Sequence, residues 1–320
     1  MGIITTQVDT ASLRKAYAET LIEIAVRRRE IVVLDADLAL STQTYRFKQL
    51  FPERFFDMGV SEADMIDTGV GLALSGKIVF VSSFAMFATA KPWEQIRNSA
   101  AYAEVALKIV ASHSGISVGE DGASHQAIED LGLMRLIPNI TVFIPADANA
   151  VKKIIHLAVE TPGVVYVRLT RPSLPLFYTE DTEFDNKGFV LLRNFEKPDA
   201  VIVATGSMVY PSLKASLELE KKGVKIGVVD VYRLKPYPFR PLLPIFQGIK
   251  FIVTVEEHNI IGGLGESLSS FITEVEPHIV KKIALPDAFG VSGNYEALYD
   301  FYGLTTEKII SRIEEWLKSI

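Results

Sequence analysis

The sequence contains no cysteine, which excludes several kinds of chemistry at once. Disulfides, thiolate metal sites and a cysteine nucleophile are all impossible. The absence suits a reducing compartment, and we expect a cytoplasmic protein. Long apolar runs are also missing, because the longest stretch without a formal charge, 200–213, is interrupted by Gly206 and Pro211. A membrane-spanning helix needs about 20 apolar residues, so we expect no membrane association.

An excess of basic residues is missing as well. The chain of 320 residues carries 33 basic and 39 acidic side chains, for a net charge of −6. Modules that bind nucleic acid are usually basic, so we expect no nucleic-acid partner. Hydrophobic residues make up 48% and charged residues 22%, which is typical of a globular protein. The length favours roughly two domains.

Short β-branched runs alternate with longer amphipathic segments along the chain, which predicts an α/β fold. We expect two domains, 1–175 and 197–320, each with a mainly parallel sheet flanked by helices. The stretch 172–198 is polar and acidic and contains Pro172, Pro175 and Pro198, and we expect the interdomain linker over 176–196. The strands are predicted at 31–34, 78–81, 106–111, 141–144, 164–169, 200–204, 224–229, 251–255 and 279–284. The helices are predicted at 13–29 with Ser12 as N-cap, 63–74, 93–104, 126–136, 148–160, 209–222, 264–274 and 306–318.

Two glycine motifs have the letters of phosphate-binding loops but not the full pattern. Gly71–Lys77 lacks the Ser or Thr that should follow the lysine, and it leads from a helix into a strand, the reverse of the required order. The run Gly262-Gly263-Leu264-Gly265 follows a predicted strand and opens a predicted helix, but it lacks the third glycine of the dinucleotide fingerprint. We therefore expect a tight turn there.

Three segments of the first domain could carry chemistry. The segment 56–65 places Glu62 at the start of a helix, where a carboxylate is also favoured electrostatically. The segment 83–90 holds two phenylalanines three residues apart, either a flat platform or ordinary core packing. The segment 113–126 has two histidines in a glycine-rich loop after a strand, where α/β proteins bind ligands. These histidines could be plain loop residues or, with Asp121, metal ligands.

Taken together, these segments resemble the transketolase family of thiamine-diphosphate enzymes. The matching motifs are Gly59-Val-Ser-Glu62, Phe84-x-x-Phe87 and His113-x7-Asp121-Gly-x-x-His125-Gln126. In the second domain they are Val203-Ala-Thr-Gly-Ser207, Val229-Asp230, Val255-Glu-Glu-His258 and Gly262-Gly-Leu-Gly265. The resemblance spans nearly the whole chain but only the C-terminal half of a full transketolase, the pyrimidine-binding domain plus the C-terminal domain.

The resemblance implies a two-carbon ketol transfer from a ketose phosphate to an aldose phosphate with thiamine diphosphate. Family members hold the diphosphate through Mg²⁺ with a Gly-Asp-Gly motif, which this sequence lacks. An N-terminal partner subunit would therefore supply the motif and be the main binder of Mg²⁺ or a similar divalent cation. No metal ligand is expected in this chain. The implied assembly is a dimer of heterodimers, and the single chain should be inactive.

The resemblance also implies roles for individual residues. Glu62 would hydrogen-bond the pyrimidine, and Phe84 and Phe87 would stack on it. His113 and His125 would act in catalysis and bind substrate. Ala90 departs from the family, which often has a third aromatic there. The remaining cofactor positions are Asp37, Leu38 and Val60, and Asp35 is the alternative to Asp37. The remaining substrate positions are Asp121, Arg171 and Ser41, and Arg168 is a weaker candidate than Arg171.

Other functions remain open at this point. A relative of 1-deoxyxylulose-5-phosphate synthase would share the loop and the second domain, although that family usually has Glu-Gln-His where this chain has Glu62-Ala-Asp64. The β subunit of a 2-oxoacid dehydrogenase is also split, but lacks the His125 arrangement. A non-catalytic scaffold subunit and a nucleotide-binding electron carrier are the alternatives from other classes.

Overall fold

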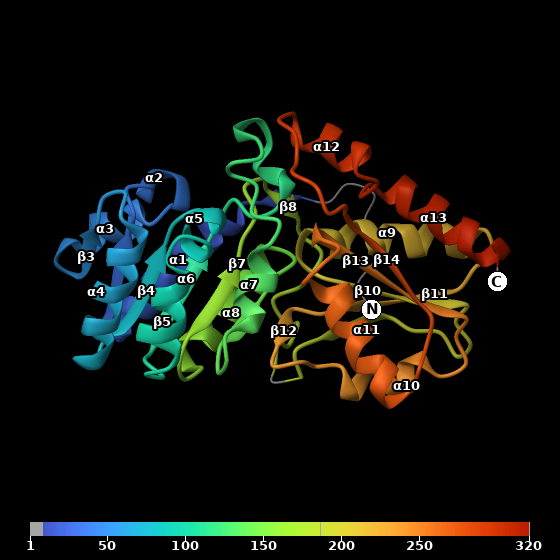
Figure 1. The fold of residues 1–320 in the computed structure, drawn as a ribbon, viewed down its shortest axis with the longest axis horizontal. Coiled ribbons are helices and arrows are strands. Elements are labelled where there is room, and N and C mark those ends of the chain that lie inside the picture. The colour runs from blue at the N-terminus through green and yellow to red at the C-terminus, as the bar shows by residue number, and fades with distance from the viewer. Residues whose placement is uncertain (1–8, 186, 320) are drawn as a thin grey trace.

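The computed structural model describes residues 9–185 and 187–319, which form two mainly parallel sheets flanked by helices (Figure 1). This confirms the predicted α/β class. Residues 1–8 of the first expected domain, 186 of the expected linker and 320 lie outside the described residues. None of the helices in the described part of the chain has the length and apolar character needed to cross a bilayer.

The first sheet has seven strands in the order β12-β6-β7-β5-β4-β2-β3, and only the β12–β6 pairing is antiparallel. Its inner strands are buried along their length, as expected for parallel strands covered on both faces. The strands are β2 (Ile31–Asp35), β3 (Phe55–Asp57), β4 (Ile78–Ser82), β5 (Leu107–Ala111), β6 (Thr141–Phe143), β7 (Val165–Arg168) and β12 (Arg233–Lys235). A separate pair is formed by β1 (Thr10–Ala11) and β8 (Leu174–Pro175).

Polar caps fix the starts of two long helices in the first half. The Ser12 hydroxyl accepts the Lys15 N–H at 3.3 Å, which confirms the predicted N-cap of α1. Asp147 caps α8 through the Ala150 N–H at 2.7 Å. The helices of this half are α1 (Leu13–Arg27), α2 (Ala39–Thr42), α3 (Tyr45–Leu50), η1 (Pro52–Arg54), α4 (Glu62–Leu74), α5 (Ala85–Thr89), α6 (Trp93–Gln95), the π-helix η2 (Ile96–Ala101), η3 (Ile116–Asp121), α7 (Asp130–Leu136) and α8 (Ala148–Glu160).

The second sheet has five strands in the order β14-β13-β10-β11-β9, and only β9 is antiparallel to its neighbour. Strand β9 lies inside the segment expected to be a linker. The strands are β9 (Val190–Arg193), β10 (Ala200–Ala204), β11 (Ile226–Asp230), β13 (Phe251–Asn259) and β14 (Val280–Leu285). The helices are η4 (Gly206–Met208), α9 (Val209–Lys221), η5 (Arg240–Leu242), α10 (Leu243–Phe246), α11 (Leu264–Val275), α12 (Tyr295–Phe301) and α13 (Thr306–Ser319).

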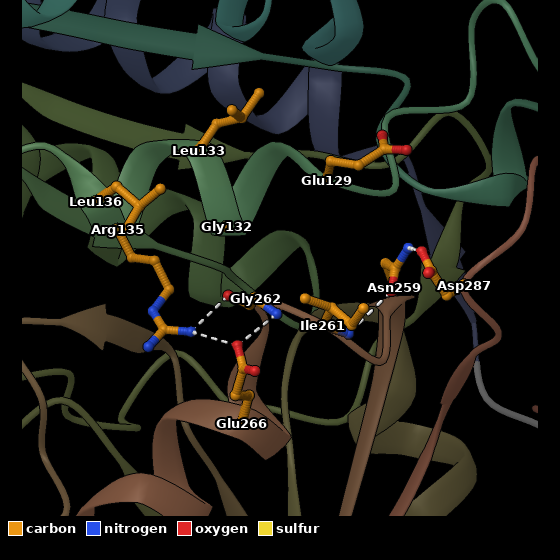
Figure 2. Close-up of a pocket in the computed structure, with 10 residues that line it drawn as sticks. All are labelled: Glu129, Gly132, Leu133, Arg135, Leu136, Asn259, Ile261, Gly262, Glu266 and Asp287. Atoms are coloured by element: carbon orange, nitrogen blue, oxygen red, sulfur yellow. Dashed lines mark hydrogen bonds and ion pairs between the residues drawn. The ribbon is translucent and has the colours of Figure 1, made fainter.

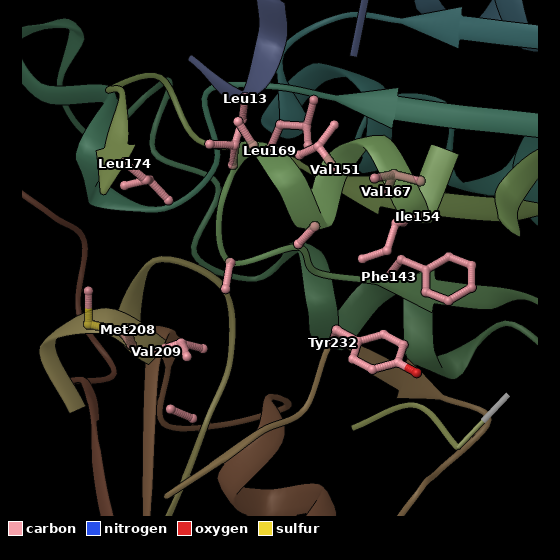
Figure 3. Packing of buried hydrophobic residues seen from close by; sticks show 14 of the residues in the cluster. Leu13, Phe143, Val151, Ile154, Val167, Leu169, Leu174, Met208, Val209 and Tyr232 are labelled. Atoms are coloured by element: carbon pink, nitrogen blue, oxygen red, sulfur yellow. The ribbon is translucent and has the colours of Figure 1, made fainter. Parts of the chain in front are cut away.

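The two halves are packed against each other through apolar side chains. One buried cluster runs from Leu13 of α1 through Val151 of α8 to Met208, Val209 and Tyr232 of the second half (Figure 3). Strand β12 also comes from the second half, yet it pairs with β6 of the first sheet. The halves therefore share a core and a sheet.

Two predicted helices differ from the structure. The stretch 93–104 contains α6 followed by the π-helix η2, which ends at Ala101. The helix predicted over 126–136 begins only at Asp130. Residue Ala127 is instead tied to the preceding loop, because it forms a parallel bridge with Ser114 and its carbonyl accepts the Gly115 N–H at 2.9 Å. This tertiary pairing overrides the local helical pattern.

Candidate functional site

Most of the predicted site residues follow the carboxyl ends of parallel strands in the first sheet. Ser41 comes after β2, Phe84 and Phe87 after β4, His113 after β5 and Arg171 after β7. Parallel pairing of these strands places those ends at one edge of the sheet. This edge is where open α/β sheets bind ligands.

Two phenylalanines and two histidines form one cluster of rings. The rings of Phe84 and His113 stack with 3.8 Å between centroids and 24° between planes. Phe84 and Phe87 are also stacked, with centroids 6.0 Å apart. His125 meets Phe87 edge-on at 5.1 Å. The structure therefore brings together four residues that the sequence places in two separate motifs.

Glu62 is buried at the start of α4 and paired with a lysine that the sequence analysis missed. Its side chain is 5% exposed, and both carboxylate oxygens lie 3.1 Å from Lys91 Nζ. The same ammonium group lies 4.7 Å from the centre of the Phe87 ring, a cation–π contact. Lys91 thus links the carboxylate to the ring cluster. It had no signal in the sequence beyond following the Phe84–Phe87 motif.

His113 is held as a neutral imidazole. Burial lowers the pKa of His113 to about 3, and the positive charges of Arg14 and Arg171 act in the same direction. Its Nδ1 lies 2.8 Å from the hydroxyl of Ser112, which orients the ring. A neutral imidazole keeps one N–H that can donate to a substrate oxygen.

A second missed residue, Arg14 on α1, ties two predicted substrate positions together. Its guanidinium donates to the carbonyl of Ser41 at 2.7 Å and to the carbonyl of Arg171 at 2.9 Å. The Arg171 side chain in turn donates to the carbonyl of Val118 and lies 3.4 Å from the Glu120 carboxylate. No local pattern could indicate Arg14, because its partners lie 27 and 157 residues away.

The turn after β2 separates the two aspartates that the sequence left as alternatives. Asp35 is fully buried and accepts the hydroxyls of Thr42 and Thr44 at 2.7 and 2.8 Å. It also accepts the Leu38 N–H at 2.7 Å, so it builds the turn. Asp37 is exposed, with φ of 63°, and its N–H donates to Asp57. Only Asp37 is placed to meet another molecule.

Three further predicted residues are less enclosed than the rings. Leu38 is half-buried, whereas Val60 is 74% exposed and Asp121 is exposed at the end of η3. In this chain Val60 is therefore open to solvent, beside the buried Glu62. Among the residues described, no three His, Cys, Asp or Glu side chains are grouped so that they could hold a metal ion.

The glycine-rich turn between β13 and α11 is occupied by the protein itself. Glu256, fully buried, accepts the N–H groups of Leu264 and Gly265 at 2.7 and 2.8 Å. A Cβ on Gly263 would lie 2.0 Å from this carboxylate. The turn is thus the tight turn expected, with a carboxylate where a phosphate would have to bind.

A cavity of about 420 Å³ lies between α7 and the β13–α11 turn (Figure 2). Its polar groups are paired with one another: Arg135 donates to the Gly262 carbonyl at 2.7 Å, and Asn259 donates to Asp287 at 3.1 Å. Leu136 and Ile261 add exposed apolar surface. The cavity contains none of the predicted site residues.

Comparison with known proteins gives matches along nearly the whole chain. Residues 9–176 match the family "Transketolase, pyrimidine binding domain" and residues 191–309 match "Transketolase, C-terminal domain". A Methanocaldococcus jannaschii protein whose name includes the words "transketolase C-terminal section" is 44% identical over 96% of both chains. A mouse protein named Transketolase-like protein 2 is 33% identical over 96% of this chain, which spans only 49% of that protein.

A solved structure shares the fold over almost the full length. It is described as "Split gene transketolase, inactive beta4 tetramer". Its TM-score is 0.87 with 39% sequence identity, and the match covers 97% of this chain and 99% of that one. The family similarity therefore extends to a protein of about the same length as this chain.

Proposed function

The chain belongs to the transketolase family, and from this we propose that it is the C-terminal subunit of a two-subunit, thiamine-diphosphate-dependent transketolase. It would transfer a two-carbon ketol unit from a ketose phosphate to an aldose phosphate. Catalysis would need an N-terminal subunit, in a dimer of heterodimers. The observation that carries the proposal is the buried carboxylate of Glu62, which Lys91 connects to the stacked rings of Phe84 and Phe87.

Glu62, Phe84 and Phe87 suit the aminopyrimidine end of thiamine diphosphate but not its diphosphate end. A buried carboxylate and two phenyl rings suit an aminopyrimidine, through a hydrogen bond to a ring nitrogen and through stacking. For a Mg²⁺-bound diphosphate, the described residues offer no cluster of metal ligands. This division supports a partner subunit that grips the diphosphate, and exposed Val60 beside Glu62 would then be covered at the subunit contact.

The cofactor, when bound, supplies the carbon nucleophile and the electron sink for the transferred unit. Glu62 would hold a proton at the pyrimidine ring nitrogen. Neutral His113 and nearby His125 would donate N–H groups to the ketose oxygens, where negative charge develops. Arg171 would exchange its half-exposed contact with Glu120 for the sugar phosphate, a surface pair that costs little to break. Asp121 and Ser41 would contact the sugar hydroxyls.

The test is an assay of both subunits together with xylulose 5-phosphate and ribose 5-phosphate. We expect sedoheptulose 7-phosphate from the assembled protein and none from this chain alone. Condensation of pyruvate with glyceraldehyde 3-phosphate in its place would overturn the transketolase assignment in favour of the 1-deoxyxylulose-5-phosphate synthase type.

Glu62→Ala separates catalysis from helix stabilisation. Glu62 and Asp64 both lie in the first turn of α4, where either carboxylate favours the helix, but Asp64 is exposed. We expect Glu62→Ala to lose at least about a hundredfold in kcat while the subunits still assemble, and Asp64→Ala to retain activity. Equal activity of the two variants would favour a scaffold subunit.

A further inference from the structure

A single carboxylate from the second half reaches the loop that carries His113. Glu257 on β13 is 1% exposed. Its Oε1 accepts the N–H of Ser117, in η3 of the first half, at 2.7 Å. Its Oε2 accepts the hydroxyls of Ser207 and Tyr299, both of the second half, at 2.6 and 2.8 Å. The side chain therefore ties the loop after β5 to η4 and to α12, and α12 lies beside this loop (Figure 1).

The loop is shaped around this carboxylate. Gly115 has φ of +69°, a conformation that favours glycine. A Cβ at Gly115 would lie 2.2 Å from Glu257 Oε1, so no larger residue fits while Glu257 keeps its place. The Glu257 side chain occupies the space that a Cβ at position 115 would need, which explains the glycine there.

His113 needs such an anchor, because its backbone is in an unfavourable region. Its φ is 59°, the left-handed region, which is uncommon for a residue other than glycine. Such residues persist where the surroundings fix them. Three attachments follow within four residues: Ser114 donates to the Leu169 carbonyl, Gly115 to the Ala127 carbonyl and Ser117 to Glu257. Only the last comes from the second half of the chain.

We propose that Glu257 is a positioning residue that fixes the backbone of 113–117 and thereby the His113 imidazole over Phe84. This gives the C-terminal domain a role in the site of the first domain. The part about catalysis rests on the proposed function, whereas the attachment of the loop does not.

The neighbouring residue provides a matched control. Glu256 and Glu257 are both buried carboxylates that accept backbone N–H groups, but successive residues of a strand face opposite sides. Glu256 caps α11, far in the chain from the His113 loop. Glu256→Ala and Glu257→Ala therefore remove the same group on the two faces of β13.

The first measurement is hydrogen–deuterium exchange on the isolated chain, which needs no activity. In Glu257→Ala we expect amides of 114–121 to exchange about tenfold faster or more, with 262–267 unchanged. In Glu256→Ala we expect amides of 262–267 to exchange faster and those of 114–121 to stay unchanged. Glu257→Gln should keep slow exchange, because its amide oxygen can accept from Ser117 while its NH₂ donates to the two hydroxyls. If Glu257→Ala does not fold, Tyr299→Phe removes one contact to the same carboxylate and should show a smaller change in 114–121.

The second measurement uses the protein assembled with its partner subunit. We expect Glu257→Ala to lower kcat by about tenfold to a hundredfold, since misplacing a catalytic group by about 1 Å has that effect. The Kd for thiamine diphosphate, followed by circular dichroism, should change less than about threefold, because Glu62 and Phe87 lie on other elements. Glu257→Gln should restore most of kcat.

Two results would overturn the positioning role: wild-type exchange over 114–121 in Glu257→Ala, or equal losses of kcat in Glu256→Ala and Glu257→Ala. Failure of the proposed function has another signature. In that case the wild-type assembly would produce no sedoheptulose 7-phosphate, while the exchange pattern of the variants would still report whether Glu257 fixes the loop.

Discussion

At the scale of single residues, the pairing with Lys91 explains how the Glu62 carboxylate can stay buried in this chain. An ionised carboxylate taken out of water needs a partner, and removing that partner is costlier than losing an exposed ion pair. Lys91 Nζ contacts both oxygens, and its side chain remains 49% exposed. It can therefore compensate Glu62 in the free chain and, under the proposed function, still move when the cofactor binds.

Replacing Lys91 should therefore destabilise the free chain. We expect Lys91→Met to lower the free energy of unfolding by about 1 to 2 kcal/mol, because Glu62 would remain buried without a cation. Urea denaturation measures this. Lys152 is a matched control, with a side chain 48% exposed and its Nζ 3.8 Å from exposed Glu180. Lys152→Met should change stability by less than about 0.5 kcal/mol; equal losses would contradict the compensation of Glu62.

The buried imidazole of His113 should make stability depend on acid. Burial, with Arg14 and Arg171, lowers its folded-state pKa to about 3, below the ordinary value of about 6.5. Between these pH values only the unfolded chain binds the proton, so stability present above pH 6.5 is lost as the pH falls. Relative to His113→Gln, the wild type should lose about 1.4 kcal/mol per pH unit below pH 6.5. Urea titrations from pH 7 to 5 test this, and a constant difference between the two proteins would contradict it.

At the scale of elements, the β13–α11 turn depends on a glycine for lack of space. Gly263 faces the Glu256 carboxylate that caps α11, so Gly263→Ala should cost about 2 kcal/mol or more through overpacking and loss of the cap. Gly71 in α4 is the control, because a Cβ there meets nothing within 4 Å. Gly71→Ala should be neutral or stabilise by up to about 1 kcal/mol. Thermal or urea unfolding measures both variants. Equal stability of Gly263→Ala and Gly71→Ala would contradict the role of Gly263 in the turn.

Elements with a strong local pattern were the ones that the sequence predicted well. Strand β10 (Ala200–Ala204) and helix α8 (Ala148–Glu160) have the predicted bounds, since the first is an apolar run and the second starts at an Asp cap. Strand β12 was missed because it has only three residues, two of them basic, and exists through its pairing with β6. Local periodicity carries no information about such a partner.

The candidate site also divides into residues with a local sequence pattern and residues identified only by distant partners. Motif spacing identified the two phenylalanines and two histidines whose rings the structure brings together. It could not find Lys91, Arg14 or Glu257, because their partners Glu62, Arg171 and Ser117 lie 29, 157 and 140 residues away in the sequence. Ionic and hydrogen-bond partners at such separations are fixed by the fold, and a single sequence does not display them.

At the scale of the whole molecule, polar and apolar contacts join the two halves. His258 of β13 accepts the N–H of Gly132 in α7 at 3.3 Å, and Arg168 of β7 donates to the carbonyl of Glu257 at 3.0 Å. Tyr178, from the segment expected to be a linker, donates to buried Asp230 of β11 at 2.6 Å. These links add to the shared apolar cluster and to β12 in the first sheet.

The two halves should therefore unfold together, and the two tryptophans allow this to be measured. Trp93 on α6 reports on the first half, where its indole N–H donates to the Leu133 carbonyl at 3.0 Å. Trp316 on α13 reports on the second half and packs edge-on against Phe251 at 6.2 Å. Trp93→Phe and Trp316→Phe leave one reporter each. We expect both fluorescence transitions in urea to coincide in midpoint and slope, as in cooperative unfolding. Separate midpoints, with one half still folded, would show that the common core does not couple the domains.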